Sequence, residues 1–559
     1  MSYHRFRPRS HFQAPHSWSN DPCGAVYVPE IKEYIICYQW NPGTTDGGNS
    51  AWGMARSKDL VTWRDCLPAI QNGPTYDALG VFSGSIVSRL IDGERVLFLF
   101  YTSVSALPIH WSKPYLKGCE SQSVAVSKDF GETWSRFEGN PLLDVPPHAD
   151  ATTGWRDPFV SRWSSLSTLL GLNQETAYMM LASGKREHGP QLQLYRSDNF
   201  SDWSHVSTIL DAKMDSEISE ASSHRFGKNF ECASFFSIGQ LDYILVGVEE
   251  DEFSQRHRSH LTLWLAGQLK LDDTGKPRFE TLGHGLLDHG ISYAPHIFRD
   301  AQDRLLQLGW ADEAAKDQVI KAQGWAGTLV HPRELIQVIR PHLPDDLTND
   351  HEWTLDSSTG LYTTLGIRPA HQVEALRGQQ VASSLTEFKD IQSTNFEVQA
   401  SFNNLTGKEK LVLNVRQAPD SAEVTKLVFN LEQRRIEVDR SHSSLAGLGA
   451  STPDVGHFQL LPGEDLQFRI FVDNSVLEVY ANDRFALTSR VYPSLDSAVG
   501  ASYDFGSLPL ENIKFQCWID LRDAWPRRSP SVLTNDVGFP RPEMMKRKEF
   551  QGEEVLIMS

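Results

Sequence analysis

The sequence predicts an all-β protein in which a five-bladed β-propeller is followed by a C-terminal β-sandwich. Strand-like runs such as 34–40, 96–104 and 177–183 are rich in β-branched and aromatic residues, while long helical periodicity is absent. The first part of the chain repeats, and the pattern changes after residue 345. At 559 residues the chain also exceeds the roughly 250–300 residues that one core supports, so we expect at least two domains.

Three similar turn segments recur at a constant spacing. SKDLVTW begins at Ser57, SKDFGETW at Ser127 and SDNFSDW at Ser197, so successive serines lie 70 residues apart. Each segment has a Ser and an Asp before a turn and a Trp after it. A four-stranded propeller blade with long loops accommodates this repeat, and the region before residue 345 holds nearly five copies. The repeat therefore predicts five blades.

A second series of five unusual motifs has a similar period. NDP, FSGS, WRDP, FEC and SYA contain, in order, Asp21, Ser83, Asp157, Glu231 and Tyr293, at intervals of 62, 74, 74 and 62 residues. Motifs at one phase of a blade repeat occupy equivalent places, and the innermost strands of a propeller converge on its axis. We therefore expect these five residues to face one pocket.

Beyond residue 345 the pattern becomes a clean alternation of apolar and polar residues. It is seen in 396–404, 426–440 and 466–483, and Asp473-Asn474-Ser475 predicts a hairpin turn. Several such hairpins indicate a β-sandwich. The expected organisation is a catalytic propeller domain at 1–345, a linker at 346–375, a sandwich at 376–525 and a surface tail at 526–559.

The composition excludes several classes of partner. With 53 Lys and Arg against 71 Asp and Glu the formal charge is −18, which disfavours nucleic acid and anionic membranes. No run approaches the roughly 18–20 apolar residues of a membrane span. The N-terminus lacks the apolar core of a signal peptide, and the six cysteines are scattered, as free thiols are. We expect a cytoplasmic protein, or a secreted one if a leader has been removed.

Three of the convergent residues are carboxylates, which suggests a catalytic site. Asp21, Asp157 and Glu231 at one axis would repel each other and lose solvation, at several kcal/mol per ion unless paired. Such groups cluster at functional sites, and Arg156 could keep one of them ionised. Nearby aromatic residues suit the apolar face of a sugar, so glycoside hydrolysis is expected. HExxH, zinc-spaced His pairs, GxSxG and complete phosphate loops are absent, so we expect no metal and no cofactor.

The motifs WSNDPCG, YQWNP, FSGS, WRDP and FEC, in this order, resemble the signature of glycoside hydrolase family 32. Its members are invertases, inulinases, levanases and fructosyltransferases, which act on β-fructofuranosides. Residues 332–338 resemble the segment that closes the family's propeller, and 468–493 resemble its sandwich domain, so the likeness covers nearly the whole chain. The resemblance implies five blades and a retaining mechanism.

Matched position by position, the family motifs imply a role for each carboxylate. Asp21 would be the nucleophile, Asp157 the transition-state stabiliser and Glu231 the general acid and then base. Retention requires the nucleophile and acid carboxyls about 5–5.5 Å apart, with a raised pKa on the acid. The residues that would line the fructose subsite are Asn20, Gln39, Trp52, Phe82, Ser83, Arg156 and Tyr293.

Two positions depart from the commoner family pattern. Cys23 stands where NDPNG has Asn, and Ala233 stands where ECP has Pro. Such changes resemble fungal members that transfer fructose to another sugar. The expected function is a retaining β-fructofuranosidase that acts on sucrose and fructooligosaccharides, with transfructosylation at high sucrose. The acceptor subsites are expected from loops around Asp77 and residues 249–260.

Other functions stay open at this point. An exo-inulinase or levanase would share the same motifs, and an inverting arabinanase-like enzyme would have carboxyls about 6.5–9.5 Å apart. A non-catalytic sugar-binding protein and a sialidase are weaker alternatives. The expected partner is a small-molecule or oligosaccharide fructoside, with no nucleic acid and no membrane, and a homodimer is left open.

Overall fold

The computed structural model describes residues 3–73, 75–219, 224–249, 260–347, 351–357, 359–388 and 391–528, and strands at 545–550 and 553–558. The α-helices in these ranges, α1 (Ser164–Leu170) and α2 (Asp317–Gln323), have seven residues each. Nearly all other regular structure is strand, which confirms the all-β prediction. None of the described helices has both the length and the apolar character needed to span a bilayer.

Within the described residues, the chain up to Pro369 forms five largely antiparallel sheets. The first contains β1 (Ser17–Val28), β2 (Glu33–Asn41), β3 (Ala51–Ser57) and β4 (Trp63–Asp65). The second contains β5 (Gly80–Ile91), β6 (Glu94–Val104), β8 (Glu120–Ser127) and β9 (Ser135–Arg136). The third contains β10 (Thr152–Arg162), β11 (Ala177–Lys185), β12 (Gly189–Ser197) and β13 (Ser204–Asp211). The fourth contains β14 (Asn229–Ile238), β15 (Leu241–Glu249), β16 (His260–Leu271) and β17 (Pro277–Leu286). The fifth is built on β18 (Ser292–Arg299), β19 (Leu305–Ala311), β22 (Arg333–Arg340) and β24 (Leu361–Pro369), with β21 (Thr328–Leu329) and β23 (Thr354–Asp356) beside them.

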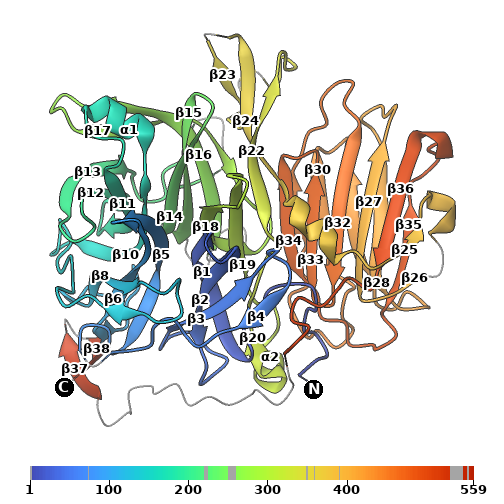
Figure 1. Cartoon of the computed structure of the whole chain (residues 1–559). Helices are drawn as coiled ribbons and strands as arrows, with labels where there is room; N and C mark the ends of the chain where they lie inside the picture. Colours follow the sequence, from blue (N-terminus) through green and yellow to red (C-terminus); the bar gives the residue numbers. More distant parts are fainter. Residues whose placement is uncertain are drawn as a thin grey trace.

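The first strands of the five sheets form a closed ring. Each packs against the next in the order β1, β5, β10, β14, β18, and β18 packs against β1 (Figure 1). The later β20 (Trp325–Ala326) pairs in parallel with β1, which ties the end of this region to its beginning. Because neighbouring sheets cover both faces of the middle strands, β15 is buried at every position. This burial explains the continuous apolar runs in the sequence.

The 70-residue repeat marks the turn between the third and fourth strands of three successive sheets. Ser57 ends β3, and its Oγ accepts the Leu60 N–H at 2.7 Å while Asp59 Oδ1 accepts the Thr62 N–H at 2.7 Å. The same pattern recurs at Ser127 with Asp129 and at Ser197 with Asn199. Short polar side chains that bond the backbone specify such turns, so the repeat reflects local turn chemistry.

Part of the range expected as a linker belongs to the fifth sheet. Strand β24 pairs with β22 from Arg333 opposite Pro369 to Arg340 opposite Tyr362, and β23 pairs with β24. The structure therefore places Thr354–Asp356 and Leu361–Pro369 in a sheet where the sequence analysis expected a linker. The polar stretch after residue 340 had indicated a boundary because a long loop between two strands is also polar.

The C-terminal part consists of two six-stranded sheets that share one apolar core, as in a β-sandwich. One sheet contains β25 (Gln379–Ala382), β36 (Ile513–Ile519), β27 (Asn395–Phe402), β32 (Leu466–Asp473), β33 (Val476–Ala481) and β34 (Phe485–Arg490). The other contains β26 (Ile391–Gln392), β35 (Gly500–Asp504), β28 (Lys410–Gln417), β29 (Thr425–Asn430), β30 (Arg435–Asp439) and β31 (Asp454–His457). Phe396, Leu413, Phe429 and Ile470 are among the fully buried core residues. The expected turn joins β32 to β33 at Asn474, whose φ is 56°.

Buried charges join the sandwich to the ring of sheets. Glu478 on β33 accepts hydrogen bonds from Arg333 Nη2 at 2.9 Å and is bonded to His11 Nε2 at 2.8 Å. The other nitrogen of His11 lies 2.7 Å from Asp473 Oδ2. Burial alone would lower the pKa of His11, but the two carboxylates raise it to about 9. Breaking one such buried pair costs about 3–5 kcal/mol, so this network holds the two parts in one arrangement.

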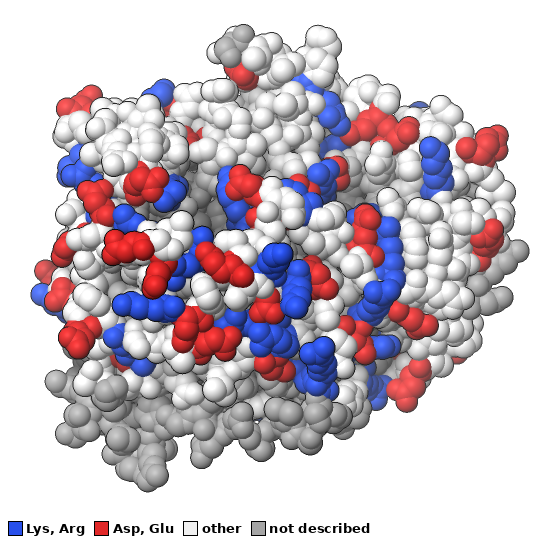
Figure 2. All heavy atoms as spheres, viewed as in Figure 1, with Lys and Arg blue, Asp and Glu red and all other residues white. Residues whose placement is uncertain are grey.

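The C-terminal strands pair with a short strand that follows β6 and form a separate three-stranded sheet with it. Strands β37 (Met545–Phe550) and β38 (Glu553–Met558) form a hairpin, and β38 pairs with β7 (Ala106–Leu107) (Figure 1). On the face shown in Figure 2, basic side chains lie among acidic ones instead of gathering in a region of one sign.

Candidate active site

Each of the five convergent motifs lies at a β-bulge on the first strand of its sheet. The pairing register shifts between Ser19 and Pro22, Phe82 and Gly84, Arg156 and Phe159, Glu231 and Ser234, and Tyr293 and His296. A bulge adds a residue to one strand, bends it and redirects the side chain. Because the five first strands stand side by side in the ring, the bulges direct these side chains to one region. This arrangement is the structural basis of the second sequence series.

Three residues at the bulges have a left-handed backbone. Asp157, Cys232 and Ala294 have φ values of 62°, 46° and 51°. Such a conformation costs about 1–3 kcal/mol for a residue with a side chain and persists where surrounding contacts hold it. The Asp157 N–H donates to Thr102 Oγ1 at 2.9 Å, and the Cys232 N–H donates to Asp157 Oδ2 at 2.9 Å. Strain of this kind is typical of functional sites.

Asp21 is held by donors from two sheets. Ser83 Oγ donates to Asp21 Oδ2 at 2.6 Å, and Asn20 Nδ2 donates to Oδ1 at 3.0 Å. Burial raises the pKa of Asp21 and the charge of Glu231 adds to this effect, while the two donors oppose it. Asn20 and Ser83, which were expected in the fructose subsite, therefore contact the expected nucleophile directly.

Asp157 lies near Asp21, and the Cys232 thiol contacts both carboxylates. The Cys232 thiol lies 3.4 Å from Asp21 Oδ2 and 3.5 Å from Asp157 Oδ2. Burial raises the pKa of Asp157 to about 7, even though Arg156 opposes the shift. The thiol thus links carboxylates that are 136 residues apart in the chain.

Glu231 is paired with a buried arginine. Arg156 donates to Glu231 Oε1 from Nε at 3.1 Å and from Nη2 at 3.0 Å, and Tyr293 OH donates to Oε2 at 2.8 Å. Burial alone would raise the pKa of Glu231, but Arg156, His260 and Tyr293 bring it below its ordinary value. The sequence analysis expected a raised pKa on this acid, whereas the guanidinium of Arg156, which lies against the carboxylate, holds its pKa below the ordinary value.

Arg156 also serves two further carboxylates that the sequence analysis did not identify. Its Nη1 donates to Glu120 Oε1 at 2.9 Å, and its Nη2 donates to Glu249 Oε2 at 3.3 Å. Burial and the charge of Glu231 raise the pKa of Glu249 to about 8. The charges of Asp157, Glu231 and Glu249 affect one another's pKa, so these three carboxylates titrate as a group that shares protons. A sequence signal existed for Glu249, since it ends an apolar strand buried at every position.

Two of the expected subsite residues are buried and donate hydrogen bonds to the start of β5. Gln39 Nε2 donates to the Val81 carbonyl at 2.9 Å, and Trp52 Nε1 donates to the Phe82 carbonyl at 3.0 Å. Their exposures are 2% and 0%, so in this arrangement they hold the start of β5 and thereby position Phe82. Direct contact of Gln39 and Trp52 with a sugar stays a prediction.

The expected acceptor loops are only partly described. Asp77 is buried and accepts hydrogen bonds from Tyr101 OH at 2.9 Å and Arg136 Nε at 2.7 Å, so it acts as a structural ion-pair partner. Residues 250–259 of the second loop lie outside the described residues. Its flanks are Glu249 and His260, and the His260 ring lies 4.6 Å from the Tyr293 ring.

A cavity of about 670 Å³ lies further along the same five strands. Its lining includes Tyr27, Arg89, Arg162, Ser237 and Arg299, and it contains none of the predicted site residues. These lining residues follow the bulges by several positions on each strand. The bulged motifs and the cavity therefore occupy different ends of the ring.

The site suits acid–base chemistry better than metal binding. Glu231, Glu249 and His260 place one ligand atom each within 4.8 Å of the others. However, Arg156 bridges the two carboxylates, and a guanidinium at that place repels a cation. The site is a largely buried group of carboxylates with different pKa values. Glycosidases use carboxyl groups of this kind as the acid and as the nucleophile or base.

Comparison with known proteins agrees with this assignment. Residues 11–342 match the Glycosyl hydrolases family 32 N-terminal domain, and residues 369–516 match the Glycosyl hydrolases family 32 C terminal region. The chain therefore belongs to glycosyl hydrolases family 32, as the sequence motifs had indicated, and it is a glycoside hydrolase.

Individual relatives cover most of the chain. It is 27% identical over 509 residues to the sucrose-6-phosphate hydrolase of Escherichia coli, covering 87% of this chain and 90% of that protein. It is similar to the structure of Aspergillus kawachii β-fructofuranosidase in complex with glycerol, at 27% identity and a TM-score of 0.81, with 94% and 96% covered. The fructosyltransferase of A. japonicus, at 24% identity and a TM-score of 0.80 over 94% and 96% of the chains, is similar in fold.

Proposed function

We propose that this chain is a retaining β-fructofuranosidase that cleaves terminal β-D-fructofuranosides, such as sucrose and fructooligosaccharides, through a covalent fructosyl-enzyme. The observation that carries the proposal is the convergence of Asp21, Asp157 and Glu231, each at a bulge on the first strand of its sheet. The similarity to a protein named β-fructofuranosidase supports the fructoside as substrate.

The proposal includes an architecture. We assign one propeller blade to each of the five sheets, because their first strands close into a ring and the third-to-fourth-strand turn repeats. The catalytic domain then extends to Pro369, at the end of β24, and the sandwich begins with β25. In this arrangement the sandwich braces the fifth blade through the network around Glu478.

In the proposed mechanism, Asp21 attacks the ketal carbon of fructose while Glu231 protonates the leaving oxygen. The positive charge that develops on the sugar is stabilised by Asp21 and by Asp157. Asp157 also accepts hydrogen bonds from fructose hydroxyls. Ser83 and Asn20 hold the Asp21 carboxylate in place and oppose the rise in its pKa. In the second half, Glu231 removes a proton from the incoming hydroxyl, whose oxygen bonds to the ketal carbon as the bond from that carbon to Asp21 breaks.

Glu231 must carry a proton in the first step, although Arg156 favours its charged form. The pKa values of Asp157 and Glu249, about 7 and about 8, leave protons within the same group near neutral pH. Since these carboxylates titrate together, substrate contacts with any of them can shift a proton to Glu231.

The incoming hydroxyl decides between hydrolysis and transfer. Water gives free fructose, whereas a sugar hydroxyl gives a longer oligosaccharide. We propose that hydrolysis dominates at low sucrose and that transfer grows at high sucrose, on the strength of Cys23 and Ala233 at positions where many family members differ.

Product analysis over a wide range of sucrose concentrations tests both parts of the proposal. Sucrose 6-phosphate, inulin, levan and arabinan serve as comparison substrates, and the Asp21→Asn variant serves as the background control. The expected result is equal glucose and fructose at low sucrose, with a deficit of free fructose and new oligosaccharides at high sucrose. Equal release at all concentrations would refute transfer, and turnover of arabinan but not sucrose would refute the fructosidase. The anomeric form of the first product, followed by NMR, distinguishes retention from inversion.

The proposal also covers location and assembly. All six cysteines are free thiols, which supports a reducing, intracellular compartment. A homodimer stays a prediction, and light scattering coupled to gel filtration tests it.

A further inference from the structure

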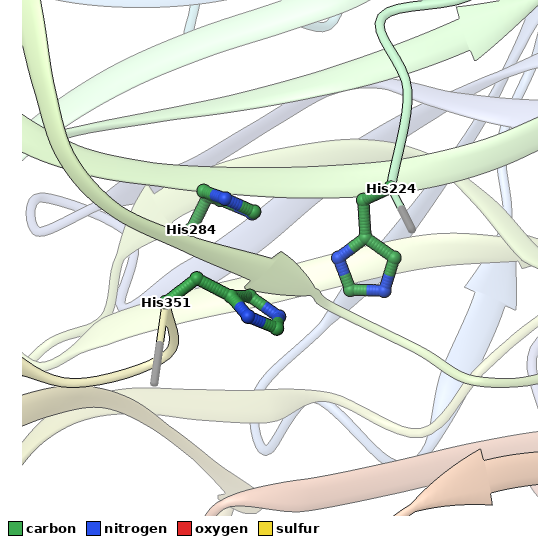
Figure 3. Close-up of side chains that lie close together, drawn as sticks. All are labelled: His224, His284 and His351. Atoms are coloured by element: carbon green, nitrogen blue, oxygen red, sulfur yellow. The ribbon is translucent and has the colours of Figure 1, made fainter. Parts of the chain in front are cut away.

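Three histidines from separate segments meet beside the fourth sheet. His284 lies on β17, His224 in the segment between β13 and β14, and His351 just before β23. Figure 3 shows the three imidazole rings gathered around a common space. The ring centroids are 4.6 Å apart for His284 and His351, 5.3 Å for His224 and His351, and 5.9 Å for His224 and His284.

The histidines have the positions that metal ligands need. One ring nitrogen from each lies within 4.8 Å of the corresponding nitrogens of the other two. Zinc bound at about 2.0–2.1 Å with tetrahedral angles sets its nitrogen ligands roughly 3.3 Å apart. Small rotations of the rings therefore suffice to bring all three nitrogens to one ion, and water would complete four-coordination.

His284 is prepared for this role by its surroundings. Its side chain is 2% exposed, and its Nδ1 is buried without a hydrogen-bond partner among the described residues. Its Nε2 lies 3.0 Å from Ser219 Oγ. Metal-bound histidines commonly use one nitrogen on the ion and donate the other N–H to an oxygen, as this arrangement provides.

The unpartnered nitrogen of His284 is a reason to expect an ion. A buried ring nitrogen without a hydrogen-bond partner is costly, and a bound metal ion would satisfy it. The lone pair of an unprotonated imidazole nitrogen is what a metal ion binds.

We propose that His224, His284 and His351 form a binding site for one divalent transition-metal ion, with zinc as the preferred ion. The site lies outside the carboxylate group of the active site. The sequence analysis expected no metal because these histidines are 60 and 67 residues apart, which no zinc motif contains.

The proposed ion would stabilise a junction between two sheets. The backbone N–H of His284 already donates to the backbone carbonyl of His351 at 2.8 Å. A Cβ at the neighbouring Gly283 would lie 2.5 Å from Thr354 Oγ1, so the two segments are in close contact. His224 also precedes β14, the strand that carries Glu231. The expected effect is therefore stabilisation of this junction, with no chemical step at the metal.

In the two other groups with metal-like spacing among the described residues, an arginine already pairs with the carboxylates. In the group of His11, His331 and Glu478, the carboxylate is paired with Arg333 at 2.9 Å. In the group of Glu231, Glu249 and His260, Arg156 occupies the corresponding place. The three-histidine cluster has neither a carboxylate nor a guanidinium among its ligands.

Metal titration of the full chain tests the proposal. After treatment with a chelator, the protein is titrated with Zn²⁺ in competition with a chromogenic chelator, and with Co²⁺ as a spectroscopic probe. We expect saturation at one ion per chain, a tetrahedral Co²⁺ spectrum and a higher unfolding temperature with Zn²⁺. The variants are His284→Gln and His351→Gln, with His442→Gln on the sandwich as the matched control.

The variants separate this site from the other candidates. His284→Gln and His351→Gln should each lose the stoichiometric binding and the thermal shift while the circular dichroism spectrum is retained. Ser219→Ala should weaken binding by about 10–100-fold, because it removes the partner of Nε2. Absence of saturable binding in the wild-type chain would overturn the proposal. So would binding by His284→Gln and His351→Gln that is as tight as binding by the wild type. Loss of binding in His260→Gln with retention in His284→Gln would also overturn it and place the ion in the active site.

Discussion

The hydrogen bond from Tyr293 to Glu231 provides a direct test of how the acid is tuned. Tyr293 is 5% exposed, and its hydroxyl donates to Glu231 Oε2 at 2.8 Å. The Tyr293→Phe substitution removes this donor and keeps the ring that packs on His260. A hydrogen bond to a charged group contributes about 1.5–3 kcal/mol, and 1.36 kcal/mol corresponds to one pKa unit. The pKa of Glu231 should therefore rise by about 1–2 units.

The sign of this shift can be read from a pH profile of kcat/KM on sucrose. The proposed mechanism needs Asp21 ionised and Glu231 protonated, so the basic limb reports the loss of the proton from Glu231. We expect the basic limb of Tyr293→Phe to move upward by about 1–2 pH units, while the acidic limb stays in place.

A matched control is available elsewhere in the ring. Tyr101→Phe removes a buried hydroxyl that donates to Asp77 at 2.9 Å, away from Glu231. This variant should lose stability without moving either limb. A basic limb of Tyr293→Phe that is unchanged or lower would refute the assignment of Glu231 as the acid tuned by Tyr293.

Three further predictions follow from particular contacts. Glu231→Gln should lower kcat by about 10²–10⁴-fold, and Asp21→Asn by at least as much, with an unchanged circular dichroism spectrum. The pKa of His11 is raised from 6.5 to about 9, so its contribution to stability is complete below pH 6.5 and is lost as the pH rises through 9. The unfolding temperature of the wild type should therefore fall over that window, by the equivalent of about 3 kcal/mol, and His11→Asn should be less stable with a flatter profile. A Cβ at Gly84 would lie 2.0 Å from the Phe100 carbonyl oxygen, so Gly84→Ala should destabilise the chain by about 1–3 kcal/mol in urea unfolding.

Each of these predictions has a contrary outcome. Near-normal turnover by either carboxylate variant would remove that residue from the mechanism. Equal slopes of unfolding temperature against pH in the wild type and His11→Asn would show that this histidine does not carry the raised pKa. Unchanged stability of Gly84→Ala would mean that the bulge in β5 can relax without cost.

Much of the fold was accessible from local sequence patterns. The turn at Ser57 and its two repeats are specified by side chains that bond the backbone a few residues away. The hairpin at Asn474 and the alternation around it were likewise visible, because a sheet with one buried face has a period of two. The linker expectation failed because β24 pairs with β22 across a long polar loop, and the loop's composition does not reveal that pairing.

The candidate site was predictable only in part. The motif series identified Asp21, Asp157 and Glu231, since unusual residues at one phase of a repeat occupy equivalent places. It did not identify Glu120 and Glu249, which share Arg156, and it assigned the raised pKa to the wrong carboxylate. The pKa shifts of these carboxylates depend on distances between side chains on different sheets, and a local sequence pattern does not predict those distances.

The amino-acid sequence by itself determined the family, the strands, the repeating turns and the residue types at each bulge, because these depend on periodicity, turn chemistry and short motifs. The tertiary structure decided which carboxylates lie against Arg156, that Gln39 and Trp52 are buried and bonded to the start of β5, and that three distant histidines meet beside β17. The physical reason is that pKa values, burial and coordination are set by separations of a few ångströms between residues far apart in the chain.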